Sequence, residues 1–193
     1  MILGPGLDRF LRAHPNLTLD LVAREQLGDM VADGFDLALR FGEPKPSRLV
    51  AKKILETRIL TVASPAYIER CGMPSTPLEL QNDSHNCIQF RDPETSRPFT
   101  WAFRKGKEQF ELALGGQLLV NDVGTLQGAC LAGYGIAQVM ELGVEHWLSS
   151  GKLVNVLQEW SDEHFPLYAL YPSRKHLPAK TRAFMTFVAS IVE

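Results

Sequence analysis

The amino-acid sequence predicts an α/β protein made of two units in which strands and helices alternate. Two kinds of observation support this fold class. Stretches in which apolar and polar residues alternate, such as residues 35–41, are interspersed with stretches whose apolar residues recur at helical spacing, such as residues 3–14. Residues that favour helix caps stand where strands give way to helices, at Ser64 and at Asn121-Asp122. Such alternation is typical of α/β folds.

The first predicted element is an amphipathic helix at residues 3–14, which ends before Pro15. The pattern is already running at the second residue, and no Ser, Thr, Asp or Asn precedes it as a cap. We therefore expect that a preceding part of the protein is missing from this sequence.

A βαβ unit is expected next. Residues 16–22 alternate in the manner of a strand, residues 26–34 predict a short helix that ends at a glycine, and residues 35–42 predict a second strand. Residues 48–63 are expected to supply two more strands. Ser64 and the proline after it then begin a helix, with the serine as its N-cap.

The middle of the chain has a different texture, because residues 76–98 are rich in turn-forming residues and are interpreted as a connecting region. Residues 99–103 and 109–120 alternate around a short turn and predict a β-hairpin. A capped helix at residues 121–133 and a buried strand at residues 134–140 complete a second α/β unit.

The last part of the chain continues the alternation. Residues 141–151 predict a helix, and residues 153–157 and 166–172 predict strands. The final helix is expected to use an apolar face formed by Phe184, Phe187, Val188 and Ile191.

Composition limits the function classes. The chain has 20 Lys and Arg residues against 22 Asp and Glu, and no run of like charge, so we expect no specific affinity of this chain alone for DNA. The three widely spaced cysteines favour a reducing, cytoplasmic setting over a disulfide framework. No stretch predicts a secretory signal or a membrane span.

The motifs of enzymes and cofactor sites are largely missing. Gly133 and Gly135 begin a pattern like a dinucleotide-binding fingerprint, but Gln138 replaces its third glycine and the pair follows a predicted helix instead of opening one. The five histidines show no metal-ligand spacing, and no nucleophile motif is present. We therefore expect no catalytic residue, no metal and no cofactor.

Three positions at predicted strand ends leave two interpretations open. Ser64 and Asn121-Asp122 either cap their helices or contact a ligand at the helix N-termini. Arg40 either forms a structural ion pair, with Asp36 as a candidate, or lines a site. If these strand ends share a crevice, partial positive charge and Arg40 favour a small ligand with a carboxylate or similar anion.

Seven stretches, in the order of the chain, match the pattern of one known family: LDRFLRAHPNLTLDLV, DGFDLALRFGEP, LVAKKI, TVASPAYIERCGMPSTPLEL, LLVNDVGTLQGACLAGYGIAQV, GKLVNVL and PLYALYPSRKHLPAKTRAFMTF. Together they resemble the effector-binding domain of LysR-type transcriptional regulators over nearly the whole chain. The resemblance implies a fold like that of periplasmic binding proteins, with two α/β subdomains, two crossover segments and a ligand cleft between the subdomains. Residues 1–63 and 167–193 would form the first subdomain, and residues 64–166 the second.

The resemblance also implies a set of effector-contacting residues. It comprises Arg24, Glu25, Arg40, Gly42, Thr61, Val62, Ser64, Asn121, Asp122, Val123 and Thr125. A two-fold homodimer is implied as well, with Leu7 and Phe10 of the first helix and Leu126 of a second-subdomain helix at its interface. Family members carry a first strand and a helix-turn-helix domain ahead of these residues, so DNA contact and any higher oligomer would involve parts that this sequence lacks.

The function predicted from the sequence is therefore the small-molecule sensing and oligomerisation domain of a bacterial LysR-type regulator. Effector binding would shift the arrangement of the subdomains and so modulate DNA binding by the full-length protein. A solute-binding protein of a transport system is the alternative, because the fold is shared. An α/β enzyme ranks third, since no acid, base or nucleophile constellation supports it.

Overall fold

The computed structural model describes residues 3–24, 26–82, 84–161, 163–172 and 177–191 of the chain. The chain forms two compact units: unit 1 contains Met1–Thr57 and Phe165–Glu193, and unit 2 contains Arg58–His164. Two strands, β2 (Leu49–Ala63) and β9 (His164–Pro172), carry the chain from one unit to the other. The division expected from the sequence, after residues 63 and 166, differs from these boundaries by a few residues at each crossing.

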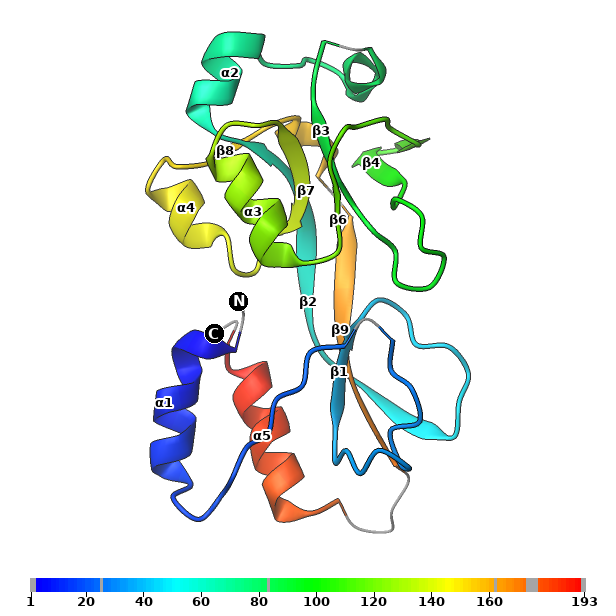
Figure 1. Cartoon of the computed structure of the whole chain (residues 1–193), viewed down its shortest axis with the longest axis vertical. Coiled ribbons are helices and arrows are strands. Elements are labelled where there is room, and N and C mark those ends of the chain that lie inside the picture. Colours follow the sequence, from blue (N-terminus) through cyan, green and yellow to red (C-terminus); the bar gives the residue numbers. More distant parts are fainter. Residues whose placement is uncertain (1–2, 25, 83, 162, 173–176, 192–193) are drawn as a thin grey trace. The chain divides into compact units, whose positions relative to one another are not determined.

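Unit 1 combines a small sheet with two packed helices. Strand β1 (Ala38–Phe41) is antiparallel to β9, and β9 in turn lies next to β2. Helix α1 (Gly4–Ala13), drawn in blue, lies beside α5 (Ala179–Ala189), drawn in red (Figure 1). The helices expected at both ends of the sequence are thus confirmed.

Aromatic side chains hold the two helices of unit 1 together. The ring of Phe10 in α1 stacks on that of Phe187 in α5, with centroids 4.8 Å apart, and meets Phe184 edge to face at 5.5 Å. A Cβ atom at Gly6 would lie only 2.7 Å from the Phe187 ring, so the glycine permits this close approach. Of the apolar stripe seen in the sequence, Phe10 is buried against α5, whereas Leu11 is exposed.

The βαβ unit expected at residues 16–42 is wrong in its first two elements. Residues 16–22 form no strand and pair with no strand among the described residues, and Leu21 and Val22 are about half exposed. Residues 26–34 form a series of turns instead of a helix. The Asp29 carboxylate explains the turns, because it accepts hydrogen bonds from two following backbone N–H groups, at 3.1 Å each.

Unit 2 is built on a sheet with the strand order β2-β7-β3-β6. Strands β3 (Cys87–Phe90), β6 (Leu119–Val120) and β7 (Ile136–Met140) are parallel to one another, whereas β2 is antiparallel to β7. Strand β8 (Val154–Asn155) pairs with the end of β2. The central strand β3 lies in the region that the sequence indicated as a connection, and β2 is one continuous strand where two were expected.

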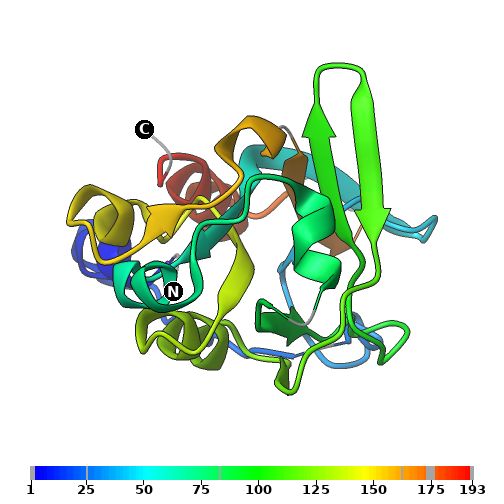
Figure 2. The same cartoon turned by 90° about the horizontal axis from the view of Figure 1, so that it is seen from above.

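The remaining elements of unit 2 cover the two faces of this sheet. They are α2 (Pro65–Cys71), the 3-10 helices η1 (Pro77–Gln81) and η2 (Gln158–Trp160), the hairpin of β4 (Trp101–Lys105) and β5 (Glu108–Leu112), and helices α3 (Val123–Leu131) and α4 (Glu145–Ser149). The predicted hairpin is confirmed, and Figure 2 shows its two strands in green, side by side.

Each face of the sheet has its own apolar core. On one face, Trp101 and Phe103 of the hairpin pack with Tyr67 of α2 and Ile136 of β7. On the other face, residues of α3 and α4 pack over the alternate residues of the same strands, among them Val62. Unit 2 therefore has three layers, with the sheet in the middle.

All three cysteines are free thiols. Cys87 and Cys130 are buried, and burial raises the pKa of each thiol to about 12. The Cys130 thiol donates to the carbonyl oxygen of Val62 at 3.5 Å. Cys71, at the end of α2, is partly exposed.

Candidate functional site

The candidate functional part of unit 2 is the edge of its sheet where the parallel strands end. Strands β3, β6 and β7 reach this carboxyl edge at Phe90, Val120 and Met140. Helix α3 begins directly after β6 at the same edge. Ligands of open α/β sheets bind outside the carboxyl ends of strands, so this is the candidate site of unit 2.

Four of the predicted effector residues lie together at this edge, in the turn into α3. Asp122 is the N-cap: its Oδ1 atom accepts a hydrogen bond from the backbone N–H of Thr125 at 2.9 Å. Hydrogen bonds from Thr125, first from its side chain and then from its backbone, hold the pKa of Asp122 below its usual value. Asn121, Val123 and Thr125 are exposed. The structure thus shows Asp122 as the cap of α3.

Ser64 lies at the opposite edge of the sheet from Asn121. Because β2 is antiparallel to β7, its carboxyl end lies beside the amino end of β7, with Val62 opposite Ala137. The register therefore separates Ser64 from Asn121 by at least the length of β3, about 13 Å for a strand of four residues. Within unit 2 these two strand ends do not share a crevice, which corrects that part of the expectation.

Ser64 and its two predicted neighbours on β2 are also buried. The Ser64 hydroxyl caps the seven-residue helix α2 by accepting from the Tyr67 backbone N–H at 3.3 Å. Thr61 is 2% exposed, and Val62 belongs to the core under α3. These side chains act in folding: they cap a helix or fill the interior of unit 2.

Two features at the carboxyl edge of unit 2 were not predicted from the sequence. Arg58 and Glu141 form a two-pronged ion pair, in which the Arg58 Nε atom lies 2.8 Å from a Glu141 oxygen. These hydrogen bonds hold the pKa of Glu141 below its usual value, against a smaller opposing effect of burial. The second feature is a hollow in the surface beside residues 92–100. The sequence did not predict the ion pair because its two residues are far apart in the chain. It did not predict the hollow because residues 76–98 resemble a connecting region.

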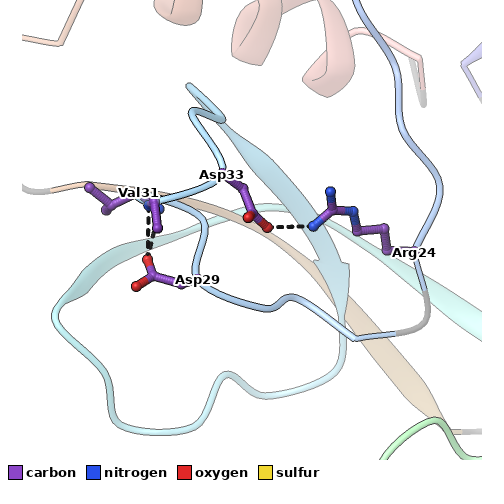
Figure 3. Close-up of polar contacts among 5 residues, drawn as sticks. Arg24, Asp29, Val31 and Asp33 are labelled. Carbon is purple, nitrogen blue, oxygen red and sulfur yellow. Dashed lines mark hydrogen bonds and ion pairs between the residues drawn. The ribbon is translucent and has the colours of Figure 1, made fainter.

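In unit 1, Arg24 makes contacts within its own loop (Figure 3). Its guanidinium forms an ion pair with Asp33. It also lies over the Phe35 ring, 4.8 Å from the ring centroid. The turn closed by Asp29 precedes Asp33 and places its carboxylate toward Arg24. Arg24 therefore helps to fix the turns of residues 26–35, where a helix was expected at residues 26–34. Glu25, its predicted neighbour, lies outside the described residues.

Arg40 and Gly42 lie at the carboxyl end of β1. Arg40 is partly buried and stands opposite Tyr168 of β9. Its suggested partner Asp36 forms an ion pair with Lys180 of α5 at 2.7 Å. Gly42 has φ +86° and donates its N–H to a β9 carbonyl at 2.9 Å, a conformation that glycine adopts readily.

The residues predicted at a dimer interface are mostly interior. Phe10 is 5% exposed and packs on α5, and Leu126 is 4% exposed within the core of unit 2. Leu7 is partly exposed. Leu11 and Val123 are exposed large apolar residues of the same two helices. A partner that docks on α1 or α3 would therefore meet these residues before it met Phe10 or Leu126.

The described part of the chain contains no cluster of three His, Cys, Asp or Glu side chains that could hold a metal ion. None of its helices combines the length and the apolar character needed to cross a membrane.

Comparison with known proteins shows the same family in sequence and in structure. The model of the LysR substrate binding domain matches residues 1–192. The HTH-type transcriptional regulator PtxR of Pseudomonas aeruginosa is 31% identical over 91% of this chain, and the uncharacterized HTH-type regulator YhjC of Escherichia coli is 31% identical over all of it. The chain spans only 55% and 64% of the lengths of these curated relatives.

Solved structures agree with the sequence relatives. The regulatory domain of CrgA, a LysR-type transcriptional regulator from Neisseria meningitidis, superposes with a TM-score of 0.86 at 28% identity, covering 100% of this chain and 92% of that one. Full-length AphB, a virulence activator of Vibrio cholerae, superposes with a TM-score of 0.80 at 27% identity, covering 96% of this chain and 62% of that one.

Proposed function

This chain belongs to the LysR substrate-binding domain family, and we propose that it is the part of a bacterial transcriptional regulator that senses a small-molecule effector. The single observation that carries the proposal is the family match over residues 1–192, which includes both units. The named relatives are transcriptional regulators, which favours this function over solute transport.

The whole protein would contact DNA through a helix-turn-helix part like the one that its relatives are named for. This chain carries a net charge of -2 and no basic run, so it offers little attraction to phosphates. It would therefore transmit the effector signal, and it needs no catalytic group to do so. A regulator of this kind acts in the cytoplasm.

The effector would contact polar groups at the strand ends of each unit. In unit 1 these are Arg40 and Gly42, and in unit 2 they are the exposed residues of the turn into α3, of which Asn121 is the first. The guanidinium of Arg40 supports an effector with an anionic group, as the sequence suggested. Ser64 is omitted, because it lies at the other edge of unit 2.

We propose that the chain also supplies a two-fold dimer contact through α1 and α3. Leu11 of α1 and Val123 of α3 are exposed apolar residues on these helices, and removing such groups from water favours association. Sedimentation at high micromolar concentration is expected to show dimers. Purely monomeric behaviour would argue against this contact.

A chimera tests the regulatory function directly. The helix-turn-helix part of CrgA would be joined to this chain, and expression from a CrgA-dependent promoter would be measured across a panel of small metabolites. We expect at least one metabolite to change expression and to raise the melting temperature of this chain, because a ligand that binds only the folded state stabilises it. The proposal would be contradicted if the chimera bound the promoter but expression did not change with any metabolite that raises the melting temperature of this chain.

A metabolite that changes expression of the chimera is then used to test the role of Arg40. Arg40→Gln should weaken its binding about tenfold, the effect of losing one charge-assisted hydrogen bond. Arg48→Gln is the matched control, because it removes the same charge from an exposed loop of unit 1. Circular dichroism checks folding: an unfolded Arg40→Gln variant would assign Arg40 to structure instead of binding.

A further inference from the structure

A hollow of about 510 Å³ lies beside the loop that follows β3 in unit 2. Its volume is in the range of sites that hold small organic molecules, roughly 300–1,000 Å³. The loop lies within residues 76–98 and just after them, the turn-rich region that the sequence indicated as a connection. The hollow is lined by Asp92, Thr95, Arg97, Pro98, Phe99 and Thr100.

The loop is held in one conformation by its own hydrogen bonds. The backbone N–H of Asp92 donates to the carbonyl of Arg97, and that of Ser96 donates back to the carbonyl of Asp92, both at 2.8 Å. Arg91 donates from its guanidinium to the Ser96 carbonyl at 2.9 Å. Ser96 is kept at φ +58°, a region that residues other than glycine seldom occupy. The lining is therefore preorganised.

One wall of the hollow is an aromatic ring that is exposed although it is fixed in position. Phe99 is 43% exposed. Its ring stacks on that of Phe90, with centroids 6.5 Å apart and planes 17° from parallel, and its N–H donates to the Phe90 carbonyl at 3.0 Å. A fixed aromatic face of this kind favours stacking with another planar group.

The second wall carries a cation. Arg97 is exposed, and its side chain forms no ion pair within the described residues. The one acidic group of the lining, Asp92, already accepts hydrogen bonds at both oxygens, from the Glu94 N–H and the Thr95 hydroxyl at 2.8 Å each. A guanidinium that is not engaged elsewhere matches a carboxylate, to which it can donate two parallel hydrogen bonds.

We propose that this hollow is a subsite that takes a small aromatic carboxylate, with Arg97 binding the carboxylate and Phe99 stacking on the ring. The proposal rests on the proposed effector-sensing function and specifies the chemical class of one ligand that unit 2 recognises. The loop follows the carboxyl end of β3, where ligands of α/β sheets are expected.

Benzoate is the probe, and the 193-residue chain is titrated with it while backbone amide signals are followed by nuclear magnetic resonance. The expected shifts centre on residues 92–100. Benzamide, which is planar but uncharged, and cyclohexanecarboxylate, which is charged but not planar, should each bind more weakly. Arg97→Gln should weaken benzoate binding about tenfold, and Phe99→Leu about threefold. Lys107→Gln, which removes an exposed charge from the hairpin turn, should leave binding unchanged.

Three results would overturn the subsite: no benzoate shifts at residues 92–100, equal binding by Arg97→Gln, or equal binding of benzamide. If the amide signals of residues outside the loop are unchanged in Arg97→Gln and Phe99→Leu, both variants are folded. A different result would refute the regulatory function: a chimera whose expression does not respond to any ligand of this chain. An effector found to bind only at other residues refutes this subsite and leaves the regulatory function standing.

Discussion

Replacing Tyr67 by Phe is expected to destabilise unit 2 by about 1 kcal/mol, because the change removes one hydrogen-bonding group and no packing. The Tyr67 ring is fully buried and lies under the Arg70 guanidinium, 5.5 Å from the ring centroid. Its hydroxyl accepts the Asn86 backbone N–H at 2.9 Å and lies 3.3 Å from His85 Nδ1. Phenylalanine keeps the ring and the cation–π contact but leaves the Asn86 N–H without this acceptor.

Thermal unfolding measures the effect. A loss of 1 kcal/mol in a protein of this size lowers the melting temperature by about 2–4 °C. Tyr134→Phe is the matched control in the same unit, because the Tyr134 hydroxyl makes no hydrogen bond within the described residues. An equal shift in both variants, or none in Tyr67→Phe, would refute the hydrogen-bond argument.

The pH dependence of the same variant gives a second check. Burial raises the pKa of Tyr67 from 10.0 to about 12. The protonated hydroxyl therefore stabilises the folded state fully below pH 10, and this contribution is lost as the pH rises toward 12. Phenylalanine does not titrate, so the stability difference between the native protein and Tyr67→Phe should shrink above pH 10. A constant difference up to pH 12 would contradict the assigned cause.

Two further predictions concern thiols and an ion pair. At pH 8 a thiol reagent should modify Cys71 rapidly and Cys87 and Cys130 only on unfolding, because burial keeps the latter two protonated; three equally fast thiols would contradict this. Glu141→Gln should cost about 0.5–1 kcal/mol at pH 7, since its pair with Arg58 is partly exposed. The lowered pKa of Glu141 means that this stability is present above the ordinary pKa of a glutamate and is lost as the pH falls through the lower pKa of the folded state, so native and variant stabilities should converge in acid.

Much of the local structure was determined by the sequence alone. The apolar spacing of residues 3–14 predicted α1, and the caps Ser64 and Asp122 marked the starts of α2 and α3. The alternation around residues 104–108 predicted the hairpin. Each of these signals lies within a few residues of the structure it specifies, because caps, turns and helical faces involve only near neighbours in the chain. The family pattern was also readable from the sequence.

The strand β3 and residues 16–34 show where local signals fail. Four residues, Cys87–Phe90, are too few to display a period, and their burial on both faces depends on the hairpin and α3, which come later in the chain. Residues 16–22 show the opposite case: they alternate as a strand should, yet no described strand pairs with them. Whether a strand forms depends on a partner as well as on its own pattern.

For the candidate site, the sequence supplied the residue types and the tertiary structure decided their places. The antiparallel direction of β2 puts Ser64 and Asn121 at opposite edges of unit 2, although both follow predicted strands. Packing on α5 buries Phe10, and the fold of residues 92–100 brings Arg97 and Phe99 to one hollow. Strand direction and coverage depend on contacts between residues far apart in the chain, so only the folded structure determines them.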